Sequence, residues 1–263
     1  MVSTARSSAA SVRGLQERAA RALPPEQVER IGDWWLRRSA TSSWWMATVL
    51  PHGDVDRAEL DRRIAIAERF YPEAGALTRF QICPGVCPAD LDGVLAGRGY
   101  RWGHPMSLEA ARIDEIRAPA PLGLRPELHP APTTAWFDTW YAVHGHGSDL
   151  RGEWAMLGRV TQPSAYASVV EGDRIVAVGR GTVDAGWVGV FGMATLPDAR
   201  GRGAGRGVLA ALAGWARSQA ADGLYLQVER ENAAARRLYE RVGFTELSGY
   251  HYRTAPSLGR PGA

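Results

Sequence analysis

The chain has 263 residues, enough for one large or two smaller hydrophobic cores, since domains usually span about 100–200 residues. Its 45% hydrophobic and 22% charged residues are ordinary for a globular protein and exclude a disordered or fibrous chain. The net charge of +3 is too small to predict nucleic-acid binding. No apolar run reaches the roughly 18 residues of a membrane span, and the first residues lack the apolar segment of a signal peptide. We therefore expect a cytoplasmic protein with neither a membrane nor a nucleic acid as partner.

Apolar spacing and breaker residues predict a mixture of helices and strands in the first half of the chain. Helices are expected over residues 11–30, interrupted at Pro24 and Pro25, and over 57–71 and 89–97, with strands over 33–39, 43–50, 79–83 and 102–110. Four tryptophans are expected to pack in the core of this half, the alternative being the interface with the second half: Trp34, Trp35, Trp44 and Trp45. The two cysteines, Cys83 and Cys87, have no second pair or histidine cluster nearby, so we expect free thiols and no metal site.

Five prolines fall between residues 119 and 132. Proline fixes its own φ and lacks an N–H donor, so this stretch predicts a connection without regular structure. We place the domain boundary there. The expected organisation is a first domain over 1–118, a linker over 119–132 and a second domain over 133–263.

The second half is expected to begin with a helix and a loop and to continue as an antiparallel meander. The expected elements are a helix over 133–143, a loop over 144–148, strands over 165–170, 175–183 and 187–196, a helix over 208–221, a strand over 224–229, a helix over 233–241 and a last strand with Tyr250 and Tyr252. Turn signals at Gly172-Asp173 and Ala185-Gly186 join the three strands of the meander.

A glycine-rich turn directly precedes the helix expected from Val208. Residues 200–207 read Arg-Gly-Arg-Gly-Ala-Gly-Arg-Gly. Glycine leaves backbone N–H groups uncovered, and the start of a helix adds unpaired donors and a positive dipole end, so the turn is suited to phosphate. The dinucleotide pattern G-x-G-x-x-G fails here, because Arg206 and Val208 stand where its third glycine belongs.

A second patterned segment runs from Asn232 to Phe244. Seven residues make almost two helical turns, so Asn232 and Tyr239 are expected on one face of a helix, with Arg236 between them.

Together the two segments resemble the GNAT acyltransferase superfamily over about residues 165–253. Arg200-Gly201-Arg202-Gly203-Ala204-Gly205 matches its motif [Q/R]-x-x-G-x-[G/A], and its second signature is matched at Asn232, Ala235, Tyr239, Gly243 and Phe244.

The resemblance implies an α/β (α+β) fold with a mixed, mainly antiparallel sheet flanked by helices. Arg98-Gly99-Tyr100 can be laid over Val242-Gly243-Phe244, which places Leu95 opposite Tyr239. We therefore expect two tandem GNAT-like units, as in tandem-domain actinobacterial members, the first degenerate because it lacks the glycine-rich turn.

The resemblance also implies acetyl-CoA or another acyl-CoA as co-substrate, with its pyrophosphate on the glycine-rich turn and its pantetheine arm along the strand before it. The residues expected to bind it are Met193, Thr195, Arg200, Arg202, Gly203, Ala204, Gly205, Arg206, Asn232 and Arg236. No metal is expected, and the protein is expected to be a monomer or a homodimer.

The implied reaction is acyl transfer to a primary amine of a small molecule, a peptide or a protein. A phenol of pKa about 10 suits protonation of a leaving thiolate of pKa about 8.5, so Tyr239 is the expected general acid. Glu229 is the first candidate for the base. The residues expected to contact the acceptor are Trp136, Trp140, His146, Asp149 and Glu153, the last three also being further candidates for the base.

Other interpretations of these residues remain open. Asn232 suits a helix N-cap that accepts from the Ala235 N–H, Tyr239 suits a core aromatic, and Glu229 suits an ion pair with Arg230 or Arg236. The whole chain also fits a non-catalytic acyl-CoA sensor, since the strand over 187–196 contains no carboxylate. RNA binding through Gly-Arg repeats is disfavoured, because the Arg-Gly tract is short.

Overall fold

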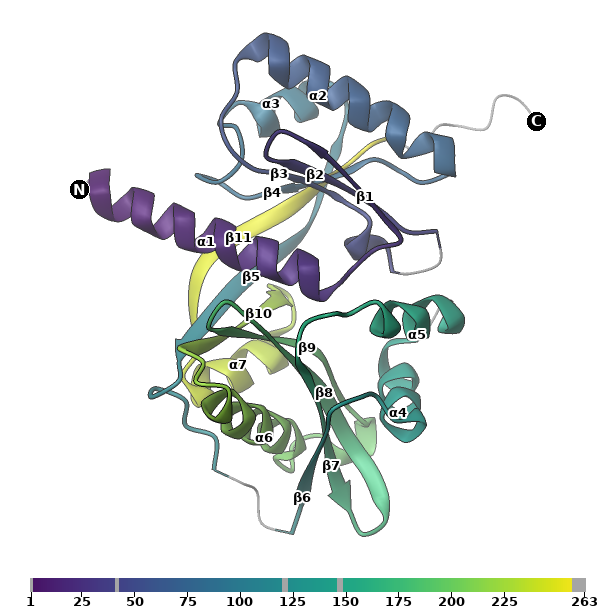
Figure 1. Ribbon diagram of the computed structural model, residues 1–263, viewed down its shortest axis with the longest axis vertical. Coiled ribbons are helices and arrows are strands. Elements are labelled where there is room, and N and C mark those ends of the chain that lie inside the picture. Colours follow the sequence, from purple (N-terminus) through teal and green to yellow (C-terminus); the bar gives the residue numbers. More distant parts are fainter. Residues whose placement is uncertain (1, 41–42, 120–122, 146–148, 257–263) are drawn as a thin grey trace.

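The computed structural model describes residues 2–40, 43–119, 123–145 and 149–256 (Figure 1). The first half contains α1 (Val2–Ala22), β1 (Gln27–Ile31), β2 (Trp34–Arg38), β3 (Val49–Pro51), α2 (Arg57–Phe70), β4 (Arg79–Ile82), α3 (Leu91–Gly97) and β5 (Arg101–Arg112). The second half contains β6 (Arg125–His129), α4 (Thr134–His144), α5 (Leu150–Gly158), β7 (Ser164–Glu171), β8 (Arg174–Asp184), β9 (Trp187–Thr195), α6 (Ala204–Ser218), β10 (Gly223–Glu229), α7 (Ala233–Val242) and β11 (Thr245–Thr254).

The strands of the described residues form one sheet that runs through both halves. Its order is β1-β2-β3-β4-β11-β5-β10-β9-β8-β7-β6, and only the pairs β3–β4 and β9–β10 are parallel. β5, the last strand of the first half, pairs with β10, whereas β11, the last strand of the second half, lies between β4 and β5. The two halves therefore exchange their final strands, which Figure 1 shows as the long teal and yellow strands crossing the middle of the molecule.

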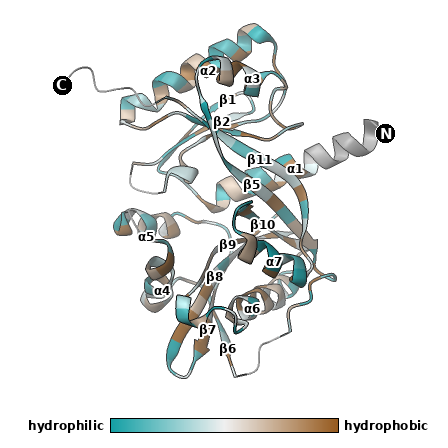
Figure 2. Ribbon diagram, turned by 180° about the vertical axis from the view of Figure 1, so that it is seen from behind, coloured by the Kyte–Doolittle hydropathy of each residue, from teal (hydrophilic) through white to brown (hydrophobic). Residues whose placement is uncertain are grey.

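The two faces of the β7–β9 region are covered by different helices. α6 presents Val208, Leu212 and Ala216 to the sheet, and it approaches closely because β8 offers it glycines: a Cβ on Gly181 would lie 3.1 Å from Leu212 Cδ2. α4 packs on the opposite face, where the indole of Trp136 donates to the Ala167 carbonyl at 3.0 Å. In Figure 2, β7 and β8 carry long brown stretches and α7 is mostly teal.

The first half has its own hydrophobic core beneath α2 and α3. Asp56 caps α2 by accepting from the Glu59 N–H at 2.8 Å. The helix then buries Leu60, Ile64, Ala67 and Phe70 against the ring of Phe80, among other residues. This core has no glycine-rich turn like that of residues 200–207.

Both predicted halves of the internal repeat end a helix in the same way. Tyr100 N–H donates to Leu95 O, and Phe244 N–H donates to Tyr239 O, each at 3.0 Å. The preceding glycines, Gly99 and Gly243, have φ of 82° and 114°, the left-handed conformation of this helix ending. The register that places Leu95 opposite Tyr239 is confirmed, and so is the expected α/β fold with a mainly antiparallel sheet.

Five local expectations were wrong. The proline-rich stretch contains β6, because Pro126 sits in the edge strand of the sheet, where a missing N–H is tolerated. Residues 43–50 form a 3₁₀ turn over Trp44–Met46 before β3, and residues 27–31 form β1, so the first helix ends at Ala22. After the loop, α5 was not expected, and α6 begins at Ala204, four residues earlier than predicted.

Candidate active site

The glycine-rich turn that leads into α6 presents a series of unpaired backbone N–H groups. Gly203 occupies the N-cap with φ 90° and no side-chain cap, and the first helical bond runs from Gly207 N–H to Gly203 O at 3.0 Å. Within the described residues, the N–H groups of 202–206 make no backbone hydrogen bond. Unpaired amides at a helix N-terminus bind anions, so the turn fits the pyrophosphate of coenzyme A.

The arginines of this turn are at the surface and differ in their contacts. Arg202 forms two parallel hydrogen bonds of 2.8 Å with Glu171, and Arg200 Nε donates to the Thr195 carbonyl at 3.3 Å. Arg206 is exposed. Gly205 has little space for a side chain, because a Cβ there would lie 3.1 Å from Leu238 Cδ2 and 3.6 Å from Thr195 Oγ1.

β9 and β10 separate beside this turn. Their parallel pairing ends at Val190 and Leu226, although β9 continues to Thr195 and β10 to Glu229. Gly192, with φ 60°, lies where the β8–β9 register shifts. Met193 and Thr195 follow it on the freed edge of β9, so backbone groups there face an opening between two strands.

α7 flanks this opening with the two residues of the second signature. Asn232 is the N-cap, its Oδ1 accepting from the Ala235 N–H at 3.1 Å, so its capping role is confirmed. Tyr239 is buried and its ring lies 5.9 Å from that of Phe244. The hydroxyl makes no hydrogen bond within the described part of the chain, and Tyr239 lines a cavity. Burial, helped by the Glu109 carboxylate, raises the pKa of Tyr239 well above its usual range.

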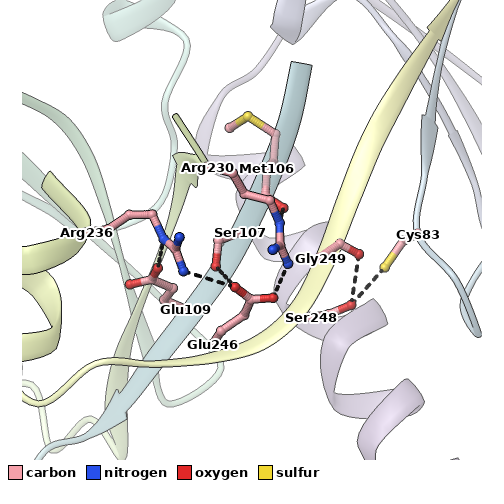
Figure 3. Close-up of polar contacts among 9 residues, drawn as sticks. All are labelled: Cys83, Met106, Ser107, Glu109, Arg230, Arg236, Glu246, Ser248 and Gly249. Atoms are coloured by element: carbon pink, nitrogen blue, oxygen red, sulfur yellow. Dashed lines mark hydrogen bonds and ion pairs between the residues drawn. The ribbon is translucent and has the colours of Figure 1, made fainter. Parts of the chain in front are cut away.

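An ion-pair network lies under α7, on β5 and β11 (Figure 3). Arg236 Nε lies 3.4 Å from Glu109 Oε1, and Arg236 Nη2 lies 3.4 Å from Glu246 Oε2. Glu246 also accepts from Ser107 Oγ at 2.9 Å and pairs with Arg230. Burial raises the pKa of Glu109, an effect that Ser107 and Arg236 oppose. Arg236 is therefore engaged by two carboxylates.

Glu229 stands apart from this network. It is exposed at the end of β10, lines the same cavity as Tyr239, and forms no ion pair with Arg230 or Arg236, which both bind Glu246. Its carboxylate is close enough to Tyr252 to raise the pKa of that phenol, although burial is the larger cause. The carboxylate is thus free to accept a proton from a group in the cavity.

A cavity of about 410 Å³ joins the opening between β9 and β10 to the first half of the molecule. Second-half walls come from α4, α5, β8, β9, β10 and α7. The first half and β11 supply walls that the sequence did not reveal: Leu23, Ser43, Trp44, Trp45, His104, Met106, Tyr250 and Tyr252. The end of α1, the 3₁₀ turn and the exchanged strands β5 and β11 bring these residues to the site.

The structure places the predicted acceptor residues unequally. Trp136 and Trp140 line the cavity, and Trp140 Nε1 would lie 3.3 Å from a Cβ on Gly192. Glu153 also lines it, with one carboxylate oxygen bound by the backbone N–H of Ser43 at 2.8 Å and by the Ser43 hydroxyl. Asp149 instead caps α5 by accepting from the Arg151 N–H. His146 lies outside the described residues.

The sequence left His144 open between a solvated loop residue and a wall of the acceptor pocket, and Arg180 was missed. His144 Nε2 lies 3.0 Å from the Met193 carbonyl, on the strand edge expected to pair with the pantetheine arm. Arg180, in the middle of β8, is 1% exposed and lines the cavity. An arginine between two glycines in an otherwise apolar strand was the available signal.

In the described ranges, no group of three or more histidine, cysteine or acidic residues is placed to hold a metal ion. Both cysteines are buried free thiols. No helix among the described residues is long and apolar enough to cross a membrane.

Comparison with known proteins indicates the same class of enzyme as the geometry of the site. Residues 124–244 match the model of the Acetyltransferase (GNAT) family. A Bacillus subtilis (strain 168) protein named uncharacterized N-acetyltransferase YobR is 27% identical over 250 residues, covering 92% of this chain and 98% of its own.

Solved structures share the fold of nearly the whole chain. The GCN5-related N-acetyltransferase from Kribbella flavida matches with a TM-score of 0.74 at 17% identity, covering 95% of this chain and 96% of its own. A tandem GNAT protein from the clavulanic acid biosynthesis pathway matches with a TM-score of 0.64 at 11% identity, covering 89% and 86%.

Three features define an acyltransferase of GNAT fold: a turn of unpaired N–H donors at a helix N-terminus, two strands that part beside it, and a helix across the gap that carries Asn232 and Tyr239. Residues 124–244 therefore form a domain of the Acetyltransferase (GNAT) family, and nearly the whole chain is similar to a protein named as an N-acetyltransferase.

Proposed function

We propose that this enzyme transfers an acetyl group from acetyl-CoA to a primary amine by direct attack within a ternary complex. The observation that carries the proposal is the connection of three features in one place: the donor turn before α6, the opening between β9 and β10, and the cavity beyond it. We further propose that the enzyme acts in the cytoplasm, as a monomer or a homodimer.

The donor turn would hold the pyrophosphate, and Arg206 is free to add a charge-assisted contact. The pantetheine arm would run along the freed edge of β9 at Met193 and Thr195, in the manner of an added strand. This path requires the arm to compete with His144 for the Met193 carbonyl. The thioester then lies in the opening between the strands, within reach of Tyr239.

The reaction requires that the amine loses one proton and that the departing sulfur gains one. The amine nitrogen forms a bond to the thioester carbonyl carbon, backbone N–H groups of β9 stabilise the oxyanion, and the C–S bond then breaks. The departing sulfur takes a proton from the Tyr239 hydroxyl, which burial keeps protonated. Glu229 receives the proton that the amine loses, through water where the acceptor does not reach it directly.

The free-energy cost of deprotonating the acceptor ammonium to the neutral amine depends on its pKa. Neutralising a lysine-like amine of pKa about 10.4 at pH 7 costs roughly 4.6 kcal/mol, whereas an amine of pKa about 8 costs roughly 1 kcal/mol. A side chain as exposed as Glu229 suits the second case better. An α-amine is therefore a better acceptor for this site than a lysine side chain.

Titration calorimetry with acetyl-CoA, followed by measurement of CoASH release with a panel of primary amines, tests the proposal. We expect binding, and release that depends on the amine. Gly205→Val should weaken acetyl-CoA binding at least tenfold, because the side chain would enter the space bounded by Leu238 and Thr195.

The matched control is Gly214→Val on the same helix, where a Cβ meets nothing within 4 Å. It carries the same change in helix propensity and should leave acetyl-CoA affinity unchanged. Absence of acetyl-CoA binding by the native protein would refute the donor site. Binding without CoASH release to any amine would refute transfer to amines.

A further inference from the structure

Arg180 points to the cavity side of the sheet. Its neighbours on β8, Gly179 and Gly181, face α6, since a Cβ on Gly179 would lie 2.6 Å from Val208 Cγ1 and one on Gly181 would lie 3.1 Å from Leu212 Cδ2. Side chains alternate between the two faces of a strand, so Arg180 extends from the opposite face. It lines the cavity there and lies over the ring of Phe191, 5.2 Å from the centroid.

The guanidinium is only partly satisfied. Nη2 donates to the Ala22 carbonyl at the end of α1 at 2.8 Å, whereas Nη1 is fully buried and has no hydrogen-bond partner. No carboxylate in the described part of the chain forms an ion pair with it. Burial lowers the pKa of Arg180, an effect that the phenols of Tyr166 and Tyr225 oppose, Tyr166 also by a side-chain hydrogen bond. Arginine nevertheless stays charged, because its pKa starts far above neutrality.

A buried charge without a counter-ion is costly, and one helix-end carbonyl does not neutralise it. The pyrophosphate of acetyl-CoA does not supply the missing charge, because its proposed site is the N-terminus of α6, on the other face of the sheet. Glu153, the buried carboxylate of the same cavity, forms no ion pair with Arg180, so a negatively charged group of a molecule bound in the cavity would supply the missing charge.

We infer that the acceptor is an amine that also carries a carboxylate, and that the Arg180 guanidinium binds this carboxylate. The inference rests on the proposed acetyl transfer and names its substrate class as amino acids. A single guanidinium balances the single charge of a carboxylate, whereas a phosphate monoester brings a second negative charge. The other charged side chains of the cavity, Glu153 and Glu229, are negative and suit the ammonium end of the same molecule.

The test compares each α-amino acid with its own amide, and β-alanine and γ-aminobutyrate with theirs, by CoASH release. Amino acid and amide share the carbon chain and differ at the carboxylate. Loss of that negative charge also lowers the pKa of the neighbouring amine, which favours the amide, so a preference for the acid cannot come from the amine. For the best acceptor, we expect kcat/KM to be about 100-fold higher for the acid than for the amide, because the amide leaves the buried guanidinium without its counter-ion. Taurine and phosphoethanolamine, tested alongside, should be poor acceptors.

Arg180→Met should remove that preference by raising KM for the acid about 100-fold, while activity with the amide stays within a few-fold of native. Arg174→Met is the matched control. Arg174 lies on the same strand but is exposed and paired with Asp198 at 2.6 Å, so its loss should leave acid and amide kinetics unchanged. Acetyl-CoA affinity and the thermal unfolding midpoint of Arg180→Met report whether the fold is intact.

Equal use of acid and amide by the native enzyme, or equal loss of both in a folded Arg180→Met, would overturn the inference. Better activity with taurine or phosphoethanolamine than with any carboxylate would also overturn it. If no acceptor is acetylated, titration calorimetry on the CoA-loaded protein compares N-acetyl amino acids with their amides instead. Equal affinity for the two would overturn the inference. Failure of acetyl-CoA itself to bind counts against the proposed function instead.

Discussion

Tyr239 joins a buried ring to a hydroxyl without a hydrogen-bond partner among the described residues, and this combination is unusual for a tyrosine that serves packing alone. Tyr239→Phe removes the proton donor and keeps the ring. We expect kcat to fall about 100-fold, because general acid catalysis typically contributes that much, while acetyl-CoA affinity and the unfolding midpoint stay unchanged. Single-turnover kinetics and calorimetry measure both, and native turnover in the variant would exclude the role.

The raised pKa of Tyr239 makes a prediction about pH. A higher pKa means that the neutral, proton-donating form persists to higher pH, so kcat should show no alkaline decline from this residue below about pH 10. Tyr239→Phe should lower the plateau of the kcat profile evenly. A decline below pH 9 that is present in the native enzyme and absent in Tyr239→Phe would contradict this assignment.

At the residue scale, sequence patterns located the polar groups of α7 and the turn but not their partners. The capping role of Asn232 was among the predicted interpretations, because capping is a local interaction. The partners of Arg236, Glu109 and Glu246, lie on strands 127 and 10 residues away, which no local pattern connects. Arg180 escaped notice because only the folded chain shows that its Nη1 is buried without a hydrogen-bond partner among the described residues.

The C-terminal end of α7 depends on a glycine in the left-handed conformation, and substitution of this glycine tests its contribution to stability. Gly243 has φ 114°, and a Cβ there would lie 2.7 Å from the Glu115 carbonyl oxygen. Gly243→Ala should lower the free energy of unfolding by about 3 kcal/mol, since strain in φ adds to contact with a backbone atom that cannot move aside.

Gly201→Ala is the control for this change. Gly201 also has a positive φ, 76°, but a Cβ there meets open space. Its cost should be near 1 kcal/mol, the conformational part alone. Urea unfolding of both variants separates the two contributions, and equal costs would show that the approach to Glu115 does not matter.

Elements with a strong apolar periodicity and clear boundary residues were predictable from the sequence, and elements determined by tertiary contacts were not. α6 and α7 have apolar faces and recognisable ends, although the small residues at 204–207 concealed the first turn of α6. β6 was not predicted because it contains a proline. Proline is tolerated in an edge strand, but only the folded sheet shows that β6 lies at the edge. The aromatic pair Trp44 and Trp45 suggested a strand by composition, whereas the chain turns there to reach the cavity.

At the scale of the whole molecule, the two halves are bound together far more extensively than a linker would provide. β5 and β11 cross between them, Arg21 pairs with Asp184 at 2.7 Å, and Ser43 holds Glu153. The division at residues 119–132 remains a prediction about the chain's organisation.

Because each half completes the sheet of the other, we expect the protein to unfold in one cooperative transition. Differential scanning calorimetry should give a calorimetric enthalpy equal to the van't Hoff enthalpy. Asp184→Ala should shift that single transition to lower temperature without splitting it. Two resolved transitions in the native protein would show that the halves are thermally independent.

The place of β11 also has a consequence for how the chain reaches its native state during synthesis. β4 and β5 leave the ribosome early, yet the strand that belongs between them emerges more than 130 residues later. Until then the hydrogen-bonding edges of β4 and β5 that β11 will occupy are open to wrong partners, and such long-range pairing slows folding. A nascent chain of this protein should therefore depend on chaperones more than its size alone suggests.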